Sequence, residues 1–372
     1  MKKVLIFTSD EGHLSLAQAA KEALKRANFE VRLANTAPKQ STKLYLPFYR
    51  YLPSFFQVIY RIGEKDAVQK GLKTLIKKWL EEEVKQEFKK YRPDVILSTN
   101  FFYNPVVAKI LDYQKETIPF LVVVSDPWTI HPLLFSPQAS LNLVYDQKGI
   151  KLGRKNKIPR RKLASIGWLV RKKFYQKHQP AKIRQRLGLK KGVFTLLVCG
   201  GSEGTNMILK IIPGLLTLKK PLQLIIVCGH NKLLYKTVSS FKKLLQKVNQ
   251  KDKTKLNLRV FRFTEKMPQL MAISDLVMGK AGPNLLFETT AQTKPFFAIC
   301  HIANHEEGNL QLIKEKGLGL VEENPLKAAR LLKKIINQPK ILTGFQPGIA
   351  KEKAFNRQAG ANLVQAVNQL VG

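Results

Sequence analysis

The sequence predicts an α/β fold made of two doubly wound parallel sheets, and three observations support this. The chain has 372 residues, more than the roughly 150 residues of an ordinary single domain. Short apolar runs alternate with helical patterns through both halves, which is typical of parallel sheets covered by helices. A basic stretch without strand-like runs separates the halves. With 44% hydrophobic and 24% charged residues, the chain has the composition of a globular protein with a packed core.

The first half shows this alternation from its first residues. Its long charged helix ends just before Pro93, because proline disfavours a helical conformation in the residue that precedes it. The predicted strands are residues 4–8, 30–33, 95–98, 120–124 and 163–166, and the predicted helices are residues 14–27 and 66–91.

The alternation pauses from Arg171 to Pro180 and then resumes, so we predict a domain boundary near there. Residues 1–168 form the predicted N-terminal domain, residues 169–349 the C-terminal domain, and a terminal helix at about 350–372 packs back onto the first. Two such domains facing a cleft bind ligands at the carboxyl ends of their strands. The strands predicted in the second half are residues 193–199, 222–228, 258–263, 276–278, 295–299 and 318–321.

The net charge of +38 and the pI near 10.1 favour anionic partners such as nucleic acid, anionic lipid or a phosphorylated substrate. Alternatively, many of these cations simply lie on helix faces that are exposed to solvent. If four to six of them approach an anionic leaflet at about 1 kcal/mol each, the protein adsorbs to it. The chain has no recognisable nucleic-acid module, so we expect no nucleic-acid partner.

No apolar run approaches the roughly 18 to 20 residues of a membrane-spanning helix. The N-terminus also lacks the apolar region of a signal peptide. These observations predict a cytoplasmic protein that associates peripherally with the inner face of the cell membrane. The three cysteines show no Cys-x-x-Cys spacing, so they predict no zinc or redox site.

Residues 44–62 combine many aromatic and aliphatic residues with Arg50 and Arg61. This mixture suits lipid headgroups or a pocket for acyl chains, although part of it would equally pack as core. The aromatic residues predicted to contact the acceptor are Tyr45, Phe48, Tyr49, Phe55 and Phe56.

Two glycine-rich segments each follow a predicted strand and precede a helix. Backbone N–H groups and a helix N-terminus can hold a phosphate in this arrangement, although a glycine loop also serves merely as a tight turn. Lys280 adds a positive charge to the second segment, and Glu288 lies about one turn into the following helix, where a carboxylate can accept ribose hydroxyls. The alternative for Glu288 is an ordinary solvated helix residue. The segments are Gly200, Gly201, Ser202, Glu203 and Gly204, and Lys280, Ala281, Gly282, Pro283 and Asn284.

A third cluster begins the next predicted helix with His305, Glu306 and Asn309. Carboxylate and amide groups suit sugar hydroxyls, because each can form paired hydrogen bonds. His301 and His305 have the i, i+4 spacing of zinc ligands, but no third ligand accompanies them, so we predict no metal.

In the first half, Gly12 and His13 follow the first strand, where a loop lining the ligand site belongs. A histidine there can act as a base near neutral pH, although a lone histidine is often structural. Asp126 and His131 follow the strand at 120–124 in a corresponding place.

Six motifs in order resemble those of family 28 glycosyltransferases, nearest to monogalactosyldiacylglycerol synthases and processive diacylglycerol glucosyltransferases. Ser125 to Pro132 resembles Thr-Asp-x-x-x-x-His-Pro, and Gly167 to Arg171 resembles Gly-Leu-Pro-Val-Arg. The other four are Gly200 to Gly204, Cys228 to Asn231, Lys280 to Pro283, and Glu306 with Gly308 and Asn309.

The resemblance implies a GT-B fold and an inverting transfer of a hexose from a UDP-sugar, without a required metal or other cofactor. It places UDP on the C-terminal half, where it implies donor contacts from His230, Asn231 and Phe263, and a lipid acceptor such as diacylglycerol on the N-terminal half. His13 is the implied base and Asp126 its orienting partner. The sequence contains no Asp-x-Asp, so helix N-termini and backbone N–H groups would stabilise the departing UDP.

The sequence departs from the family pattern at three places. Asp10 and Glu11 replace two glycines before Gly12-His13, His305 stands where the family has glutamine, and Asn284 replaces a glycine. The alternatives are therefore a GT-B transferase for a polyprenyl-linked or glycan acceptor, a UDP-sugar epimerase or hydrolase, and, from another class, a basic nucleic-acid-binding protein.

Overall fold

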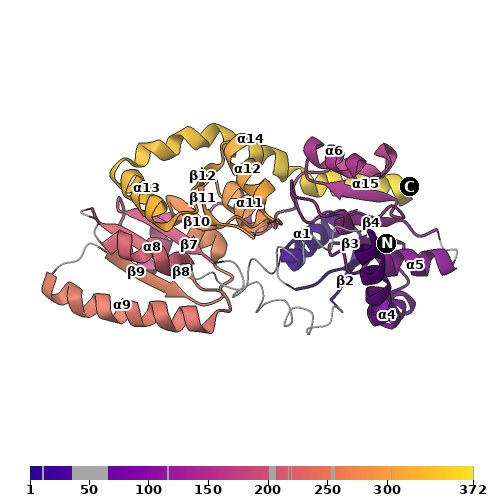
Figure 1. The fold of residues 1–372 in the computed structure, drawn as a ribbon, viewed down its shortest axis with the longest axis horizontal. Helices are drawn as coiled ribbons and strands as arrows, with labels where there is room; N and C mark the ends of the chain where they lie inside the picture. Colours follow the sequence, from indigo (N-terminus) through magenta and orange to yellow (C-terminus); the bar gives the residue numbers. More distant parts are fainter. Residues whose placement is uncertain are drawn as a thin grey trace. The chain divides into compact units, whose positions relative to one another are not determined.

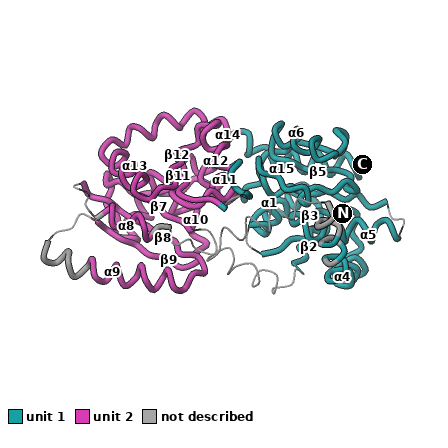
Figure 2. Tube along the Cα trace, viewed as in Figure 1, with its two compact units in different colours: residues 1–172, 302–308, 355–372 teal, residues 173–301, 309–354 magenta. Residues whose placement is uncertain are grey.

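The computed structural model describes residues 1–10, 12–35, 66–114, 117–200, 207–216, 218, 220–252, 256–302 and 304–371. The chain divides into two compact units (Figure 2). The N-terminal unit comprises Met1–Lys172, Ile302–Gly308 and Phe355–Gly372. The C-terminal unit comprises Lys173–His301 and Asn309–Ala354.

The N-terminal unit contains a parallel six-stranded sheet in the order β2-β1-β3-β4-β5-β6 (Figure 1). The central strands are buried along their whole length, which explains their continuous apolar sequences. Because β1, β3 and β4 are neighbours, the loops that follow them meet at one edge of the sheet. The strands are β1 (Lys3–Phe7), β2 (Glu30–Ala34), β3 (Val95–Ser98), β4 (Phe120–Val123), β5 (Leu141–Val144) and β6 (Leu163–Ser165).

Strand β5 has no counterpart in the sequence prediction. Its sequence, Leu-Asn-Leu-Val, interrupts the apolar run with Asn142. The structure shows why this polar residue is tolerated: Asn142 is fully buried, and its amide receives a hydrogen bond from the Ser136 N–H at 2.8 Å and donates one to the Ser136 carbonyl at 3.0 Å. A buried amide with such partners avoids the cost of an unsatisfied polar group.

Helices cover this sheet on both faces. Helix α1 packs against α15, and α4 packs against α5. Gly360 of α15 lies close to Ala23 of α1: a Cβ built on it would be 3.1 Å from the Ala23 Cβ. The helices are α1 (Gly12–Arg26), α4 (Asp66–Tyr91), α5 (Asn104–Gln114), α6 (Gln147–Lys155) and α15 (Ala359–Val371), with the short 3-10 helices η1 (Pro132–Leu134) and η2 (Arg160–Lys162).

The C-terminal unit contains a second parallel six-stranded sheet, in the order β12-β11-β10-β7-β8-β9. The strand order reverses beside β7 and β10, which is where ligands bind in doubly wound sheets. The strands are β7 (Phe194–Cys199), β8 (Leu222–Val227), β9 (Leu256–Phe261), β10 (Leu276–Lys280), β11 (Phe296–Cys300) and β12 (Gly319–Val321).

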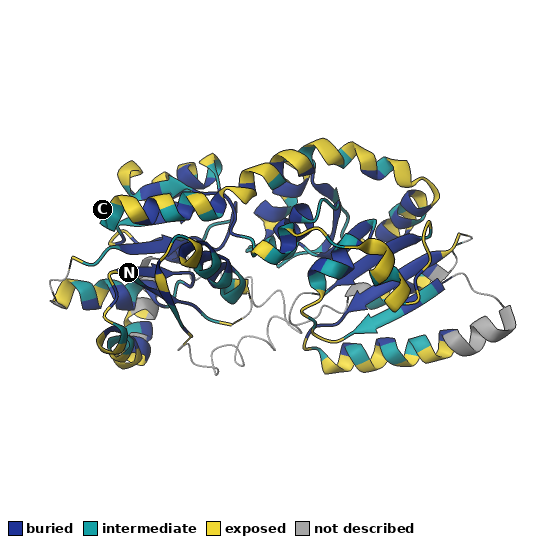
Figure 3. Cartoon of the chain, turned by 180° about the vertical axis from the view of Figure 1, so that it is seen from behind, coloured by how far each residue is buried: buried dark blue, intermediate teal, exposed yellow. Residues whose placement is uncertain are grey.

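Helix α8 packs against α13 in this unit, and together with β7 and β8 they enclose an apolar core. In both units the strands are buried while the helices show buried and exposed residues on opposite sides (Figure 3). The remaining elements are η3 (Lys172–Tyr175), α7 (Pro180–Arg186), α8 (Met207–Leu216), α9 (Lys232–Asp252), α10 (Met267–Ala272), α11 (Pro283–Ala291), α12 (Glu307–Glu315), α13 (Pro325–Asn337), η4 (Pro339–Phe345) and α14 (Gln346–Arg357). Of the helices that the structure describes, none has the length and apolarity needed to cross a bilayer.

Candidate active site

His13 lies at the start of α1 and is fixed by the end of a neighbouring strand. Its Nδ1 lies 2.7 Å from the carbonyl oxygen of Thr99. A carbonyl oxygen can only accept a hydrogen bond, so Nδ1 carries the proton and Nε2 holds the lone pair of the neutral ring. Desolvation lowers the pKa of His13, and this outweighs the hydrogen bond to Thr99 and the charge of Asp126, which both raise it. A neutral imidazole with an available Nε2 can accept a proton.

Thr99 was not singled out from the sequence. It follows β3, and its N–H donates to the Phe7 carbonyl at 3.0 Å while its hydroxyl lies 2.9 Å from the Thr8 hydroxyl. Thr99 is fully buried. Because it acts on His13 through its backbone carbonyl, its side chain gives no signal; only its place after a strand adjacent to β1 predicts the contact.

His131 has the opposite arrangement. Its Nδ1 accepts a hydrogen bond from the Leu133 N–H at 3.2 Å and so caps η1. The neutral ring therefore carries its proton on Nε2, where it can donate. The two histidines predicted at this edge of the sheet thus have opposite tautomers, and only in His13 can Nε2 accept a proton.

Asp126 follows β4 and is buried, with 3% of its surface exposed. Its Oδ2 lies 3.2 Å from Nε2 of His305, a residue far away in the sequence. Both belong to the N-terminal unit, because that unit includes Ile302–Gly308. A third titratable residue, which the sequence prediction had assigned to the donor sugar, therefore lies beside the predicted orienting partner of His13.

The segment that holds His305 is tightly fixed against the loop after β4. The Gly308 N–H donates to the Thr129 hydroxyl at 2.7 Å. A Cβ on Gly308 would lie only 2.7 Å from the Thr129 nitrogen, so only glycine permits this approach. Glu306 closes the segment: its carboxylate accepts from the Ile302 N–H at 2.8 Å, and its own N–H donates to the Ile302 carbonyl at 2.8 Å.

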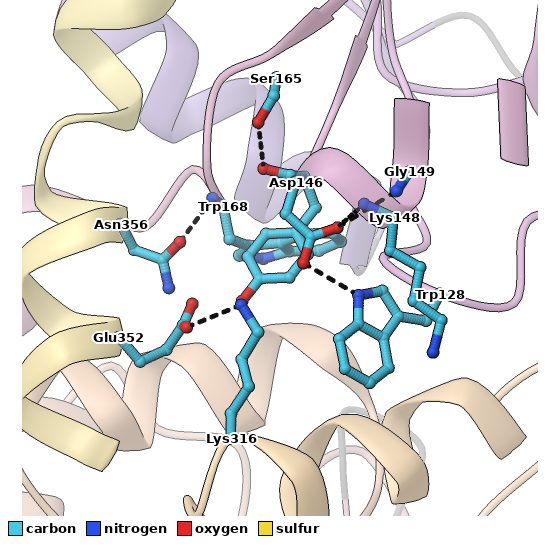
Figure 4. Close-up of polar contacts among 10 residues, drawn as sticks. Trp128, Asp146, Lys148, Gly149, Ser165, Trp168, Lys316, Glu352 and Asn356 are labelled. Atoms are coloured by element: carbon cyan, nitrogen blue, oxygen red, sulfur yellow. Dashed lines mark hydrogen bonds and ion pairs between the residues drawn. The ribbon is translucent and has the colours of Figure 1, made fainter. Parts of the chain in front are cut away.

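Trp128 anchors the same loop from the other side (Figure 4). Its indole N–H donates to Asp146 at 3.1 Å, and Asp146 also accepts from the N–H groups of Lys148 and Gly149 as the N-cap of α6. The Lys148 ammonium lies 3.6 Å from the centroid of the indole ring, in the geometry of a cation–π contact. The loop that carries Asp126 is therefore rigid.

The edge of the second sheet is built from glycine and backbone groups. Gly279 lies so close to the Cys199 carbonyl that a Cβ would clash with it. The strand then shifts register between Gly279 and Lys280, and Gly282 becomes the N-cap of α11. The first N–H groups of a helix lack intrahelical partners, so this turn offers donors to an anion.

Two side chains reach the same edge. Glu288 is buried at 9% exposure in α11, and its charge adds to the burial that raises the pKa of Cys199 at the end of β7. Asn309 is 1% exposed, and its amide nitrogen donates to the Ala281 carbonyl at 2.8 Å. Its buried amide oxygen has no hydrogen-bond partner among the described residues, and such oxygens are normally satisfied. A ligand with a hydroxyl group would satisfy it.

The loops after β8 and β9 bring together two more predicted residues. The rings of His230 and Phe263 stack with centroids 4.6 Å apart and an interplanar angle of 12°. Asn231 caps α9 by accepting from the Leu234 N–H at 2.9 Å. Phe263 is 57% exposed, so the stacked pair presents an aromatic face on which a planar base can lie.

The other predicted site residues fall into two groups. Gly12 begins α1, Gly200 follows β7, and Pro283 and Asn284 form the first turn of α11. The remaining residues lie outside the described part of the chain; they are Gly201, Ser202, Glu203, Gly204, Tyr45, Phe48, Tyr49, Phe55 and Phe56. The His301–His305 pair weighed as zinc ligands is divided: His301 Nδ1 lies 2.6 Å from Glu323 in the C-terminal unit, and His305 lies beside Asp126 in the other.

Comparison with solved structures shows which fold the chain has. Over 99% of its length, the chain resembles MurG of Acinetobacter baumannii with a TM-score of 0.62 and 14% identity, covering all of that chain. It resembles UDP-GlcNAc 2-epimerase of Neisseria meningitidis, also over 99% of its length, with a TM-score of 0.63 and 16% identity, again covering all of that chain. Together with the two parallel sheets, these similarities show the predicted GT-B fold.

Sequence comparison then identifies the relatives. Residues 195–344 match the glycosyltransferase family 28 C-terminal domain, and residues 13–170 match the monogalactosyldiacylglycerol (MGDG) synthase family. The chain is 25% identical to the probable MGDG synthase of Nicotiana tabacum and 26% identical to the MGDG synthase of Spinacia oleracea, over 89% and 88% of its length. It spans 64% and 65% of those proteins. The predicted resemblance to family 28 glycosyltransferases is confirmed.

Proposed function

We propose that this protein is an inverting hexosyltransferase that moves a sugar from a UDP-sugar to diacylglycerol or a related lipid at a membrane surface. One observation carries the proposal: the Thr99 carbonyl fixes the tautomer of His13 so that Nε2 is the proton acceptor, beside the buried carboxylate of Asp126. A base of this kind removes the proton from the acceptor hydroxyl as its oxygen attacks the anomeric carbon. The proton passes to Nε2, and the bonding electrons of the broken glycosidic bond leave with UDP.

The C-terminal unit supplies the donor site in this proposal. The backbone N–H groups in the first turn of α11 and the ammonium group of Lys280 stabilise the charge on the departing diphosphate. Glu288 binds the ribose, and the His230–Phe263 pair supports the uracil. Two similar structures fit this assignment: Anabaena HepE in complex with UDP-glucose, with a TM-score of 0.56 and 15% identity over 99% of both chains, and the Staphylococcus aureus MnaA–UDP co-structure. No metal or other cofactor is required.

The lipid acceptor is supported by the names of the relatives, which are MGDG synthases. In the proposal, Gly12 and His131 contact the acceptor, as do the aromatic residues between 44 and 62. The proposal does not specify which hexose is transferred, because His305 and Asn284 depart from the family pattern.

A positively charged surface supports docking of the N-terminal unit to an anionic membrane. No Asp or Glu occurs between Asp146 and Glu203. Six of the cations in this stretch are exposed on α6 and the segment through η2, and they form no ion pair with any residue that the structure describes; we call them the basic face. They are Lys151, Arg154, Lys155, Lys157, Arg160 and Arg161. Unpaired cations gain the most from anionic headgroups, about 1 kcal/mol each.

The test is turnover of UDP-sugars with liposomes that contain diacylglycerol, with products identified by mass. His13→Ala should lower turnover by about 10² to 10⁴ while UDP still binds. His178→Gln, a histidine of the C-terminal unit with no assigned role, should leave turnover unchanged. Near-normal turnover of His13→Ala would reject the assignment of His13 as the base. Products that carry the sugar on a polyprenyl acceptor, or epimerised UDP-sugar without transfer, reject the lipid acceptor.

A further inference from the structure

Two imidazole rings share one buried carboxylate in the N-terminal unit. Asp126 lies 3.2 Å from Nε2 of His305. The same Asp126 charge raises the pKa of His13, whereas the charge of His305 lowers it. His13 itself is held from its other side by the Thr99 carbonyl at 2.7 Å. The charges of Asp126 and His305 therefore both act on the His13 ring, with opposite signs.

The position of His305 is preorganised. The segment around it is closed by both hydrogen bonds between Glu306 and Ile302, and Gly308 fixes its end to Thr129. Its backbone N–H also donates to the Ile302 carbonyl at 3.1 Å. Because the backbone around His305 is already fixed, only the entropy of its side-chain rotamers is lost on its approach to Asp126.

We propose that His305 is a positioning residue that competes with His13 for the charge of Asp126 and thereby keeps His13 in its proton-accepting form. This rests on the proposed role of His13 as base. A carboxylate next to a histidine favours the protonated ring, which is a poor base. A positive charge at His305 opposes this influence on His13, while the Asp126 carboxylate stays in place beside the His305 ring.

The surrounding charges are consistent with this role. Among the described residues, Asp126 and His305 are the charged groups that act on His13. On the His305 side, the neighbouring carboxylates are engaged with backbone N–H groups: Glu306 with that of Ile302 and Glu307 with that of Asn304. Asp126 is therefore the carboxylate that links the two rings.

The experiment measures the pKa of His13 by NMR in the full-length protein without substrate. The chain has six histidines, and the His13 ring signal is assigned by its loss in His13→Gln. In His305→Gln, which retains a hydrogen-bond donor and removes the charge, we expect the His13 pKa to rise by roughly half a unit or more. In Asp126→Asn it should fall. In His305→Lys, which keeps a positive charge, it should stay near the wild-type value.

His301→Gln is the matched control. It removes a histidine paired with a carboxylate at 2.6 Å, in the other unit, and should leave the His13 pKa unchanged. The acidic limb of the kcat/KM profile should move to higher pH in His305→Gln, in parallel with the NMR value. An unchanged or lowered His13 pKa in a folded His305→Gln protein overturns the proposal. That outcome is independent of the turnover of His13→Ala, which tests the function itself.

Discussion

The carboxyl ends of the two sheets carry different chemistry on the same architecture. In the N-terminal unit, the loops after β1, β3 and β4 bring together titratable side chains, with His13 on the Thr99 carbonyl and Asp126 on His305. In the C-terminal unit, the loop after β10 is a close glycine turn into a helix N-terminus. One edge is suited to moving a proton and the other to holding an anion with backbone N–H groups.

The difference follows from how each edge is packed. Burial lowers the pKa of an imidazole and fixed partners orient it, and the N-terminal unit provides both for His13. A diphosphate needs room and aligned N–H groups, which β10 and α11 provide because Gly279 has no Cβ. The same doubly wound architecture therefore carries a histidine–carboxylate site in one unit and a backbone N–H site in the other.

The largest effect is expected for the proposed docking of the basic face to an anionic membrane. Reversing four charges of the basic face, in K151E/R154E/K155E/R161E, should abolish cosedimentation with vesicles of phosphatidylglycerol and phosphatidylcholine. At about 1 kcal/mol per cation, the loss is at least about 4 kcal/mol, or roughly 10³ in affinity. The control reverses four exposed cations of the C-terminal unit in K327E/R330E/K334E/K340E, with the same change in net charge.

Equal losses in both variants would show that net charge, rather than the basic face, binds the membrane. The proposal predicts no specific binding to DNA. If the wild-type protein bound DNA in a salt-sensitive way and the basic-face variant did not, a nucleic-acid partner would be favoured instead. Turnover with diacylglycerol in detergent micelles should be preserved in both variants, because the charge reversals leave both candidate sites intact.

The close turn of the C-terminal unit is tested by Gly279→Ala. The added Cβ would clash with the Cys199 carbonyl and lie 2.8 Å from the Leu285 side chain. Overpacking of this kind costs about 1 to 3 kcal/mol, so the melting temperature should fall. Gly344→Ala, in the same unit with no atom within 4 Å of the new Cβ, should change it little. If both variants melt alike, β10 does not depend on the close approach.

Glu288 tests whether side chains as well as backbone groups bind the donor. Glu288→Ala should weaken UDP binding about ten- to a hundredfold in calorimetry, since a hydrogen bond to a charged group contributes roughly 1.5 to 3 kcal/mol. Glu265→Ala removes an exposed glutamate of the same unit and should leave the affinity unchanged. A dissociation constant for Glu288→Ala equal to that of the wild type would leave the backbone groups as the main determinant of binding.

The sequence predicts the sheets well because their strands are continuous apolar runs, and it fails where burial depends on a distant partner. Strand β5 was missed because Asn142 looks polar until Ser136 is seen to satisfy it. His13 and Asp126 were predicted to share a site because each follows a predicted strand of the same sheet. Thr99 was not found, because it acts through a backbone carbonyl.

His305 shows the limit most clearly. Its motif predicts a contact with the donor sugar, which stays a prediction, and gives no sign that the ring lies beside Asp126 in the N-terminal unit. The contacts that decide this, such as that between Gly308 and Thr129, join residues far apart in the sequence. Local patterns carry no information about which unit such a loop joins.

The smallest expected effect is the contribution of His13 to the pH dependence of the free energy of unfolding. Desolvation lowers the pKa of folded His13 below the ordinary value of 6.5. Between the folded and unfolded pKa values the unfolded chain binds more protons, so the free energy of unfolding decreases as the pH falls below about 6.5. One proton accounts for at most about 1.4 kcal/mol per pH unit.

His13→Gln should therefore lose less stability than the wild type between pH 7 and pH 5 in urea unfolding, because it has no proton to bind at this position. Parallel curves for the two proteins would mean that folded His13 titrates like an exposed histidine, and the contrast between the two sheet edges would then lose its electrostatic basis.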